Sequence, residues 1–97
     1  MFGLGGIFVE VLKEVSFRLA PFSDDVAFDM IHETKGHEML AGLRGSPPLD
    51  ELTLAGTLAR ISVFAAENAE FIDTVDLNPF LVREDGAVAL DALIIPK

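Results

Sequence analysis

The sequence predicts a small α+β domain, in which an antiparallel sheet of two β-hairpins packs against two to three helices. Three observations support this class. β-branched and apolar residues gather near both ends of the chain, an i, i+3, i+4 apolar pattern occupies the middle, and Asp85-Gly86 is a strong hairpin-turn signal. Because 97 residues make one small domain at most, residues 1–97 form a single predicted domain.

The first hairpin is predicted from residues 7–13 and 16–20. The segment 7–13 is rich in β-branched and apolar residues, and 16–20 alternates polar and apolar side chains as a half-buried strand does. Lys13-Glu14-Val15 is the turn expected between the two strands, and Pro21 ends the second one.

Three helices are predicted in the middle of the chain. Ser23 is a candidate N-cap for a helix that runs to about Thr34, because two acidic residues follow it at the positive end of the helix dipole. A short helix is expected at 37–42. Asp50 caps the longest helix, at about 50–68, whose wide apolar face predicts burial on more than one side.

The second hairpin, with strands at about 71–82 and 87–95, carries the most informative polar residues. Side chains alternate faces along a strand, so Asp76, Asn78 and Phe80 share one face. The other face is apolar and is expected to pack on the helices through Val75, Leu77, Pro79 and Leu81.

The length of the hairpin connection decides whether Asp91, on the return strand, joins Asp76 and Asn78. A four-residue connection at Arg83–Gly86 sets Asn78 directly opposite Asp91, a two-residue turn at Asp85-Gly86 makes them diagonal neighbours, and a three-residue turn separates them. Carboxylate and amide oxygens suit Mg²⁺, which combines one or two carboxylates with nucleotide phosphates. The alternative, that these residues are solvated or form turns on an exposed sheet face, stays open.

A glycine-rich segment, Gly3-Leu4-Gly5-Gly6, precedes the first predicted strand. Because these glycines do not open a helix, they are not the fingerprint of a Rossmann or P-loop site. They form either a tight turn into the strand or a stretch of backbone that lines the phosphate side of a site. Arg18, on the neighbouring predicted strand, is placed to contact either Glu10 or a phosphate.

Composition excludes several classes of function. The net charge of −9 and the lack of a basic stripe exclude a nucleic-acid-binding surface, and the absence of cysteine excludes disulfides and thiolate metal sites and fits a cytoplasmic location. No segment approaches the roughly 20 apolar residues that cross a membrane. A hydrophobic fraction of 51% nevertheless predicts an apolar face that meets a partner or a second copy.

Several motifs together resemble the ATP-grasp domain of NDP-forming acyl-CoA synthetases, which include ADP-forming acetyl-CoA synthetase and are relatives of the succinyl-CoA synthetase β subunit. The resemblance covers essentially the whole chain and implies the C-terminal subdomain of that fold. The motifs occur in the family order at residues 2–13, 15–21, 35–36, 40–45, 47–48, 50, 76–82 and 89–92.

The resemblance implies an enzyme that reversibly couples cleavage of an acyl-CoA thioester to phosphorylation of ADP or GDP, through an acyl phosphate and a phosphohistidine. It implies that the chain binds Mg²⁺ together with ATP/ADP or GTP/GDP. Asn78 and Asp91 are the implied Mg²⁺ ligands, and Asp76 is a further ligand or a neighbouring partner. The residues implied to lie near the nucleotide phosphates are Gly3, Gly5, Gly6 and Arg18.

The family's first ATP-grasp subdomain and its CoA-binding and ligase domains have no counterpart in this sequence, and neither His32 nor His37 stands where the family's phosphohistidine would be. The chain, as a truncated frame, a fragment or a split subunit, is therefore expected to be inactive alone and to associate with a second copy or with a complementary subunit. The alternative is a non-catalytic remnant that acts as a dimerisation or protein-interaction module. The sequence leaves the acyl group and the choice between ADP and GDP open.

Overall fold

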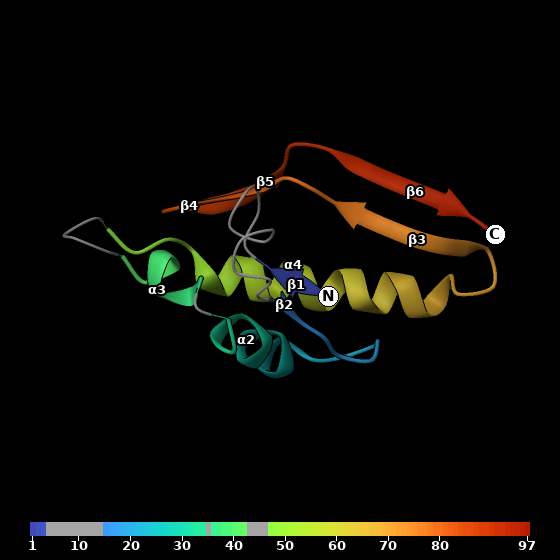
Figure 1. Cartoon of the computed structure of the whole chain (residues 1–97), viewed down its shortest axis with the longest axis horizontal. Coiled ribbons are helices and arrows are strands. Elements are labelled where there is room, and N and C mark those ends of the chain that lie inside the picture. The colour runs from blue at the N-terminus through green and yellow to red at the C-terminus, as the bar shows by residue number, and fades with distance from the viewer. Residues whose placement is uncertain (4–14, 35, 43–46) are drawn as a thin grey trace.

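The computed structural model describes residues 1–3, 15–34, 36–42 and 47–97. Helices and antiparallel strands confirm the predicted α+β class (Figure 1). The described elements in chain order are β1 (Phe2–Gly3), β2 (Val15–Ser16), α2 (Asp24–His32), α3 (His37–Leu40), α4 (Glu51–Glu67), β3 (Ile72–Leu77), β4 (Phe80–Arg83), β5 (Gly86–Ala89) and β6 (Ala92–Pro96).

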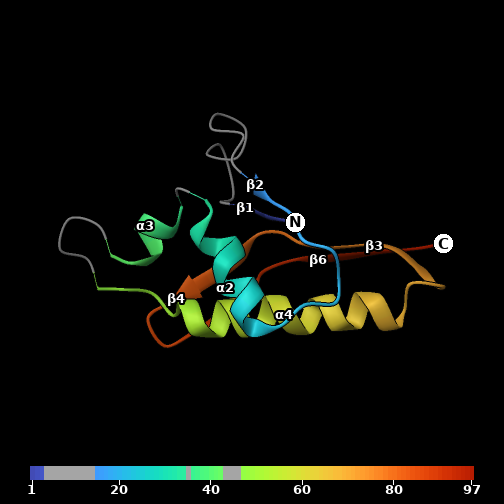
Figure 2. The same ribbon diagram turned by 90° about the horizontal axis from the view of Figure 1, so that it is seen from below.

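The long helix α4 is the central element of the molecule. In Figure 1 the C-terminal hairpin runs along one side of α4, and α2 lies on the other side. Figure 2, which views the molecule from the α2 side, shows α2 crossing α4 while β3 and β6 follow the direction of the α4 axis. The helix therefore separates two contact surfaces, one for α2 and one for the hairpin.

The core lies mainly where α2 packs on α4. It combines buried large side chains, of which Met30 and Ile31 are fully buried, with small residues of α4 such as Ala55 and Ala59. These small side chains let the two helices approach closely, in keeping with the dense packing of protein interiors. Phe80 and Val82 of β4 are half-buried against the same cluster, which anchors the hairpin to the core.

Both predicted helix caps are confirmed. The Ser23 hydroxyl accepts a hydrogen bond from the Val26 amide at 3.4 Å, and the Asp50 carboxylate accepts from the Thr53 amide at 3.0 Å and from the Thr53 hydroxyl at 2.7 Å. These two groups satisfy amides that have no partner within the first turn of a helix. The helices end within two residues of the predicted positions.

The first hairpin differs from the prediction. Phe2 pairs with Ser16 and Gly3 with Val15, so Val15 belongs to a strand and not to the turn expected at 13–15. Residues 17–20 are not a strand, and Leu19 is 92% exposed. Alternation of polar and apolar residues is insufficient by itself, because a strand also needs a partner for its backbone groups. The predicted strand at 7–13 lies outside the described residues.

The second hairpin is a single ribbon made of two antiparallel ladders, β3–β6 and β4–β5. The two continuous strands predicted at 71–82 and 87–95 are therefore each interrupted, the first at Asn78-Pro79 and the second at Leu90-Asp91. Pro79 has no amide hydrogen to give to a ladder. The described strands consequently form three two-stranded sheets in place of the one predicted sheet.

The interruption changes which side chains face α4. Before it, Val75 and Leu77 are half-buried as predicted, but beyond it Phe80 and Val82 are half-buried and Leu81 is 44% exposed. The predicted assignment of Phe80 to the polar face and of Leu81 to the packed face is therefore wrong. The prediction continues the alternation of side-chain faces through Asn78 and Pro79, which do not belong to a strand.

Candidate functional site

A cavity of about 410 Å³ lies between α4 and the hairpin. One wall consists of α4 side chains spaced three to four residues apart, at Leu54, Thr57, Leu58 and Ile61, and the opposite wall is the inner side of β3 and β4. The volume falls within the roughly 300–1,000 Å³ typical of small-molecule sites, and the lining is mostly apolar with a few polar groups, as in such sites.

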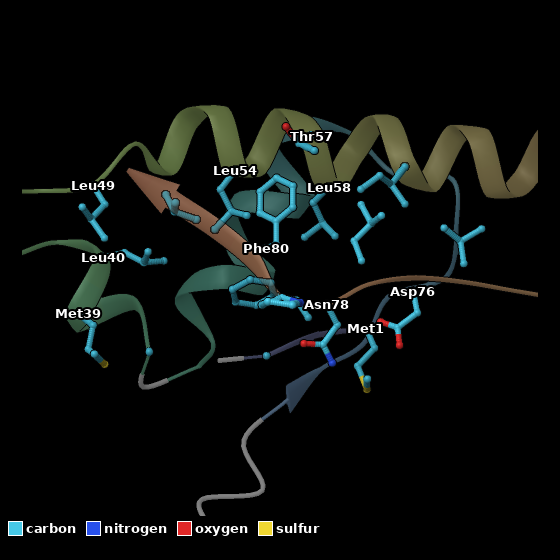
Figure 3. A pocket seen from close by; sticks show the side chains of 18 residues that line it. Met1, Met39, Leu40, Leu49, Leu54, Thr57, Leu58, Asp76, Asn78 and Phe80 are labelled. Atoms are coloured by element: carbon cyan, nitrogen blue, oxygen red, sulfur yellow. The ribbon is translucent and has the colours of Figure 1, made fainter. Parts of the chain in front are cut away.

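Asp76 and Asn78 line this cavity from the hairpin, and Met1 lies beside them (Figure 3). Both residues are exposed, so their oxygens reach solvent. The hairpin thus presents a carboxylate and an amide to an otherwise apolar hollow. This is the arrangement expected where a polar ligand group meets an apolar ligand body.

Asp91 stands directly opposite Asn78 in the ribbon. Leu77 pairs with Ala92 and Phe80 with Ala89, so the same register continues across the interruption, and the Asn78 amide donates to the Asp91 carbonyl oxygen at 3.2 Å. This is the register predicted for the four-residue connection, in which Val82 pairs with Ala87. Asp91 is not among the residues that line the cavity.

The Asp91 side chain is turned toward its own strand. Its Oδ1 atom accepts a hydrogen bond from the Ala92 amide at 2.9 Å, while Oδ2 has no hydrogen bond to the described residues. Within the described ranges, no three His, Asp or Glu side chains lie close enough together to hold a metal ion. The candidate set has two carboxylates and one amide, which fits Mg²⁺ because this ion keeps several waters and takes its remaining ligands from phosphates.

The residues predicted near the phosphates are not all brought to this site. Gly3 lies in β1 and lines the cavity, whereas Gly5 and Gly6 fall outside the described residues. Arg18 forms an ion pair with Glu33 just after α2, with Nη1 3.1 Å from Oε2, and it does not line the cavity. Its hydrogen bond lowers the pKa of the Glu33 carboxyl, so the pair stays charged at neutral pH.

Comparison with known proteins identifies the family. The family model described as an ATP-grasp domain matches residues 1–95. The chain belongs to the ATP-grasp family. It is 47% identical over 95 residues to the Acetate--CoA ligase [ADP-forming] I subunit beta of Pyrococcus furiosus, and that match covers 98% of this chain and 40% of the relative. A 44% match to the second such subunit beta of the same organism covers all of this chain and 42% of that relative.

Solved structures give the same family. A Pyrococcus horikoshii protein matches 99% of this ATP-grasp chain with a TM-score of 0.91 at 42% identity. The dinucleotide-forming acetyl-coenzyme A synthetase 1 of Ca. Korarchaeum cryptofilum, solved with coenzyme A and Mg-AMPPCP, matches with a TM-score of 0.92 at 43% identity. The chain covers 41% and 45% of these two structures, so it spans less than half the length of the relatives it matches.

The wall that α4 contributes to the cavity is not part of the site predicted from the sequence. Leu54 and Ile61 lie on the helix predicted at about 50–68, and the sequence carries no signal for a cavity over its apolar face. The structure also stacks the His32 and His37 rings with centroids 5.0 Å apart, and His32 Nε2 lies 3.0 Å from Glu51 Oε2. Neither histidine lines the cavity. Of the described helices, none has the length and apolar character needed to cross a membrane.

Proposed function

We propose that this chain is the nucleotide- and Mg²⁺-binding part of an NDP-forming acyl-CoA synthetase and is inactive by itself. The proposed overall reaction converts acyl-CoA, NDP and phosphate into the free acid, CoA and NTP. The family membership supports the class of enzyme. The chain covers only about 40% of the length of each matched subunit beta, which supports the proposal that activity needs further protein. A cytoplasmic location belongs to the same proposal.

The observation that carries the proposal is the placement of Asp76, Asn78 and Asp91 on the two facing segments of one ribbon. Asp76 and Asn78 border the cavity, and the register sets Asn78 opposite Asp91. Paired residues on neighbouring strands have Cβ atoms about 4.5–5.5 Å apart, which lets side chains share one ligand. A structural relative was solved with Mg-AMPPCP, which supports a nucleotide site in this fold.

Each residue of the proposed site has a definite task. Asn78 and Asp91 would hold Mg²⁺ through the amide oxygen and the free Oδ2 atom, and Asp76 would bind the ion or one of its waters. Bound Mg²⁺ neutralises charge on the nucleotide phosphates and orients them for transfer. The apolar walls, including Leu54 and Leu58, would receive a less polar part of the ligand and exclude water from it.

The phosphate contacts predicted for Gly3, Gly5, Gly6 and Arg18 remain part of the proposal. Gly3 borders the cavity, which supports its place beside the ligand. Arg18 would have to exchange Glu33 for a phosphate, since both of its terminal nitrogens bond to that carboxylate. A complementary chain or subunit would supply the rest of the nucleotide site, and the chain is proposed to form either that complex or a homo-oligomer.

A titration with MgADP and MgATP, followed by two-dimensional amide NMR, tests the site. Shifts are expected at residues 76–78, Asp91 and Gly3, and they should vanish when Mg²⁺ is removed. Asn78→Ala and Asp91→Ala should each weaken binding by at least about tenfold, because each removes an oxygen ligand. Asp85→Ala is the matched control, since it removes an exposed turn carboxylate from the same hairpin. Unchanged affinity in the Asn78→Ala, Asp91→Ala double variant would show that the site lies elsewhere.

A second candidate function is a non-catalytic interaction module. The exposed apolar residues of the hairpin favour it, because extensive exposed apolar surface marks protein interfaces. The large apolar side chains that are at least 40% exposed in the hairpin are Leu81, Val88, Leu90, Leu93, Ile94 and Ile95. A folded chain whose NMR spectrum ignores every nucleotide, with or without Mg²⁺, would favour this function over nucleotide binding.

A further inference from the structure

The outer edge of β6 is a surface that the proposed nucleotide site does not use. Among the described strands β6 pairs with β3 alone, and no other described strand lies along its second edge (Figure 1). All five residues, Ala92–Pro96, are exposed, with Leu93 at 56%, Ile94 at 52% and Ile95 at 42%. Leu93 and Ile95 point to one face of the strand and Ile94 to the other, so both faces are apolar and exposed.

The hydrogen bonds of the ribbon show which backbone groups face outward. The Asp91 carbonyl accepts from Asn78, and the Lys97 amide donates to Phe71 at 2.9 Å, so odd-numbered residues of β6 face β3. Even-numbered residues therefore direct their backbone groups away from β3. The Ala92 amide accordingly bonds to the Asp91 side chain, Pro96 has no amide hydrogen, and Ile94 offers both its amide and its carbonyl to a new strand.

The charges at the two ends of this segment are opposite. Asp91 precedes the apolar run and Lys97 follows it, with no charge between them. Neither side chain forms an ion pair with another residue in the described part of the chain. When two copies of such a segment run antiparallel, the acidic end of each meets the basic end of the other. A parallel pair would instead set like charges side by side.

We propose that β6 is a self-complementary docking edge, through which two copies of this chain pair in antiparallel fashion about a two-fold axis at Ile94. In this register Asp91 lies opposite the partner's Lys97, and Leu93 lies opposite the partner's Ile95. Ile94 exchanges two backbone hydrogen bonds with the partner's Ile94. Pro96 only has to accept a hydrogen bond from the partner's Ala92 amide, so its missing amide hydrogen does not prevent the pairing. On pairing, the Ala92 amide exchanges Asp91 Oδ1 for this carbonyl, which releases the Asp91 carboxylate to the partner's Lys97.

Only this register satisfies both the charges and the apolar side chains. A shift by two residues sets Asp91 opposite an apolar residue of the partner and leaves Lys97 without a carboxylate opposite it. A shift by one residue moves every side chain of one strand to the other face of the sheet. The positions 91 and 97 would be non-hydrogen-bonded pairs, in which side chains come closest. The interface is isologous and closes on itself, so it produces a dimer and no fibre.

A single-cysteine crosslink tests the register. The natural sequence has no cysteine, so Ile94→Cys introduces one thiol per chain. In the proposed dimer the two Cys side chains stand opposite each other at a Cα separation near 5.5 Å, which suits a disulfide. Ile94→Cys should therefore crosslink under mild oxidation. Two control variants should crosslink far less. Leu93→Cys places each thiol opposite the partner's Ile95, two residues away from the partner's own Cys. Val63→Cys places the thiol on α4, where residue 63 is 41% exposed, away from the proposed interface.

A charge exchange tests the ion pairs in solution. Sedimentation of the natural chain should show a dimer. Lys97→Asp or Asp91→Lys should each raise the dimer dissociation constant by about tenfold, because both Asp91–Lys97 ion pairs across the interface become pairs of like charges. The double variant that carries both substitutions should recover the natural constant. This comparison uses no nucleotide, so it is independent of the proposed function even though Asp91 belongs to the proposed metal site.

Three results would overturn the proposal. A natural chain that sediments as a monomer at high concentration has no self-docking edge. A dimer that crosslinks through Val63→Cys but not through Ile94→Cys uses another surface. Two single charge variants that weaken the dimer without rescue in the double variant would mean that Asp91 and Lys97 do not face each other across the interface.

Discussion

At the residue scale, local chemistry determined what could be predicted. Ser23 and Asp50 were recognised as N-caps because the signal lies within three residues of each, and both caps are present. Arg18 was different. Its predicted contacts were Glu10 or a phosphate, and its partner is Glu33, 15 residues along the chain. No local pattern marks Glu33, because its proximity to Arg18 depends on where α2 lies in the fold.

The Asp50 cap makes the stability of the chain depend on pH. Hydrogen bonds from the side chain and the amide of Thr53 lower the pKa of the Asp50 carboxyl below its usual value. The resulting stabilisation is present above the ordinary aspartate pKa and is lost as the pH falls through the lowered value. Asp50→Asn keeps a cap but removes the charge, so it should lower the melting temperature by a few degrees near neutral pH. This difference should disappear in strong acid.

Thermal melts of both chains across the acid range measure this dependence. Asp85→Asn serves as the control, because it removes an exposed carboxylate in the turn that caps no helix. A difference between the natural chain and Asp50→Asn that persists in strong acid would mean that charge at the cap does not stabilise α4.

At the element scale, the helices and the second hairpin followed from the sequence, and the first hairpin did not. The α4 signal extends over five turns, and the register of the second hairpin follows from a turn between adjacent strands. The prediction nevertheless assumed unbroken strands and therefore misplaced Phe80 and Leu81. The break at Asn78-Pro79 also borders the cavity, so the irregular stretch is part of the candidate site.

Two glycines in these elements should respond in opposite ways to alanine. Gly86 has φ +139° next to the hairpin turn, a conformation that strains any residue with a Cβ atom, so Gly86→Ala should destabilise the fold by about 1 kcal/mol although the added carbon meets no atom within 4 Å. A Cβ at Gly56 in α4 would lie 3.6 Å from Asp24 Oδ2, an ordinary contact. Gly56→Ala should therefore stabilise the chain by up to about 1 kcal/mol through helix propensity.

Urea denaturation of both variants measures these changes. Each variant controls for the other, because the chemical substitution is the same and only the backbone conformation differs. A stabilising Gly86→Ala would contradict the turn geometry, and a strongly destabilising Gly56→Ala would show that α2 and α4 pack more tightly at Asp24 than this contact indicates.

At the scale of the whole molecule, the apolar excess in the sequence corresponds to surfaces that the chain does not cover. The sequence predicted that an apolar face meets a partner, and the hairpin does expose apolar side chains on both faces of β6. The cavity could not be predicted, because no local pattern in the sequence sets the separation between α4 and the hairpin that follows it. The placement of Asp76, Asn78 and Asp91 on one ribbon could be predicted, since a turn between adjacent strands sets its register. Their role as metal ligands stays a prediction.

A hybrid enzyme tests the proposal that the remaining length of the relatives supplies a further part of the nucleotide site. Replacing the matched 95 residues of the Pyrococcus furiosus subunit beta with this chain should give a hybrid that converts acetyl-CoA, ADP and phosphate when the other subunit is added. The 47% identity over those residues makes a common fold the expectation. This chain alone should show no turnover, because a complementary chain or subunit is proposed to supply the rest of the nucleotide site.

The hybrid also separates the proposed site from the scaffold. Asn78→Ala in the hybrid should abolish turnover, whereas Asp85→Ala should leave it unchanged, because only Asn78 borders the cavity. Circular dichroism would verify that each variant is folded before turnover is compared. A folded hybrid that retains full activity with Asn78→Ala would exclude Asn78 as a ligand, and turnover by the isolated chain would show that its own residues complete the nucleotide site.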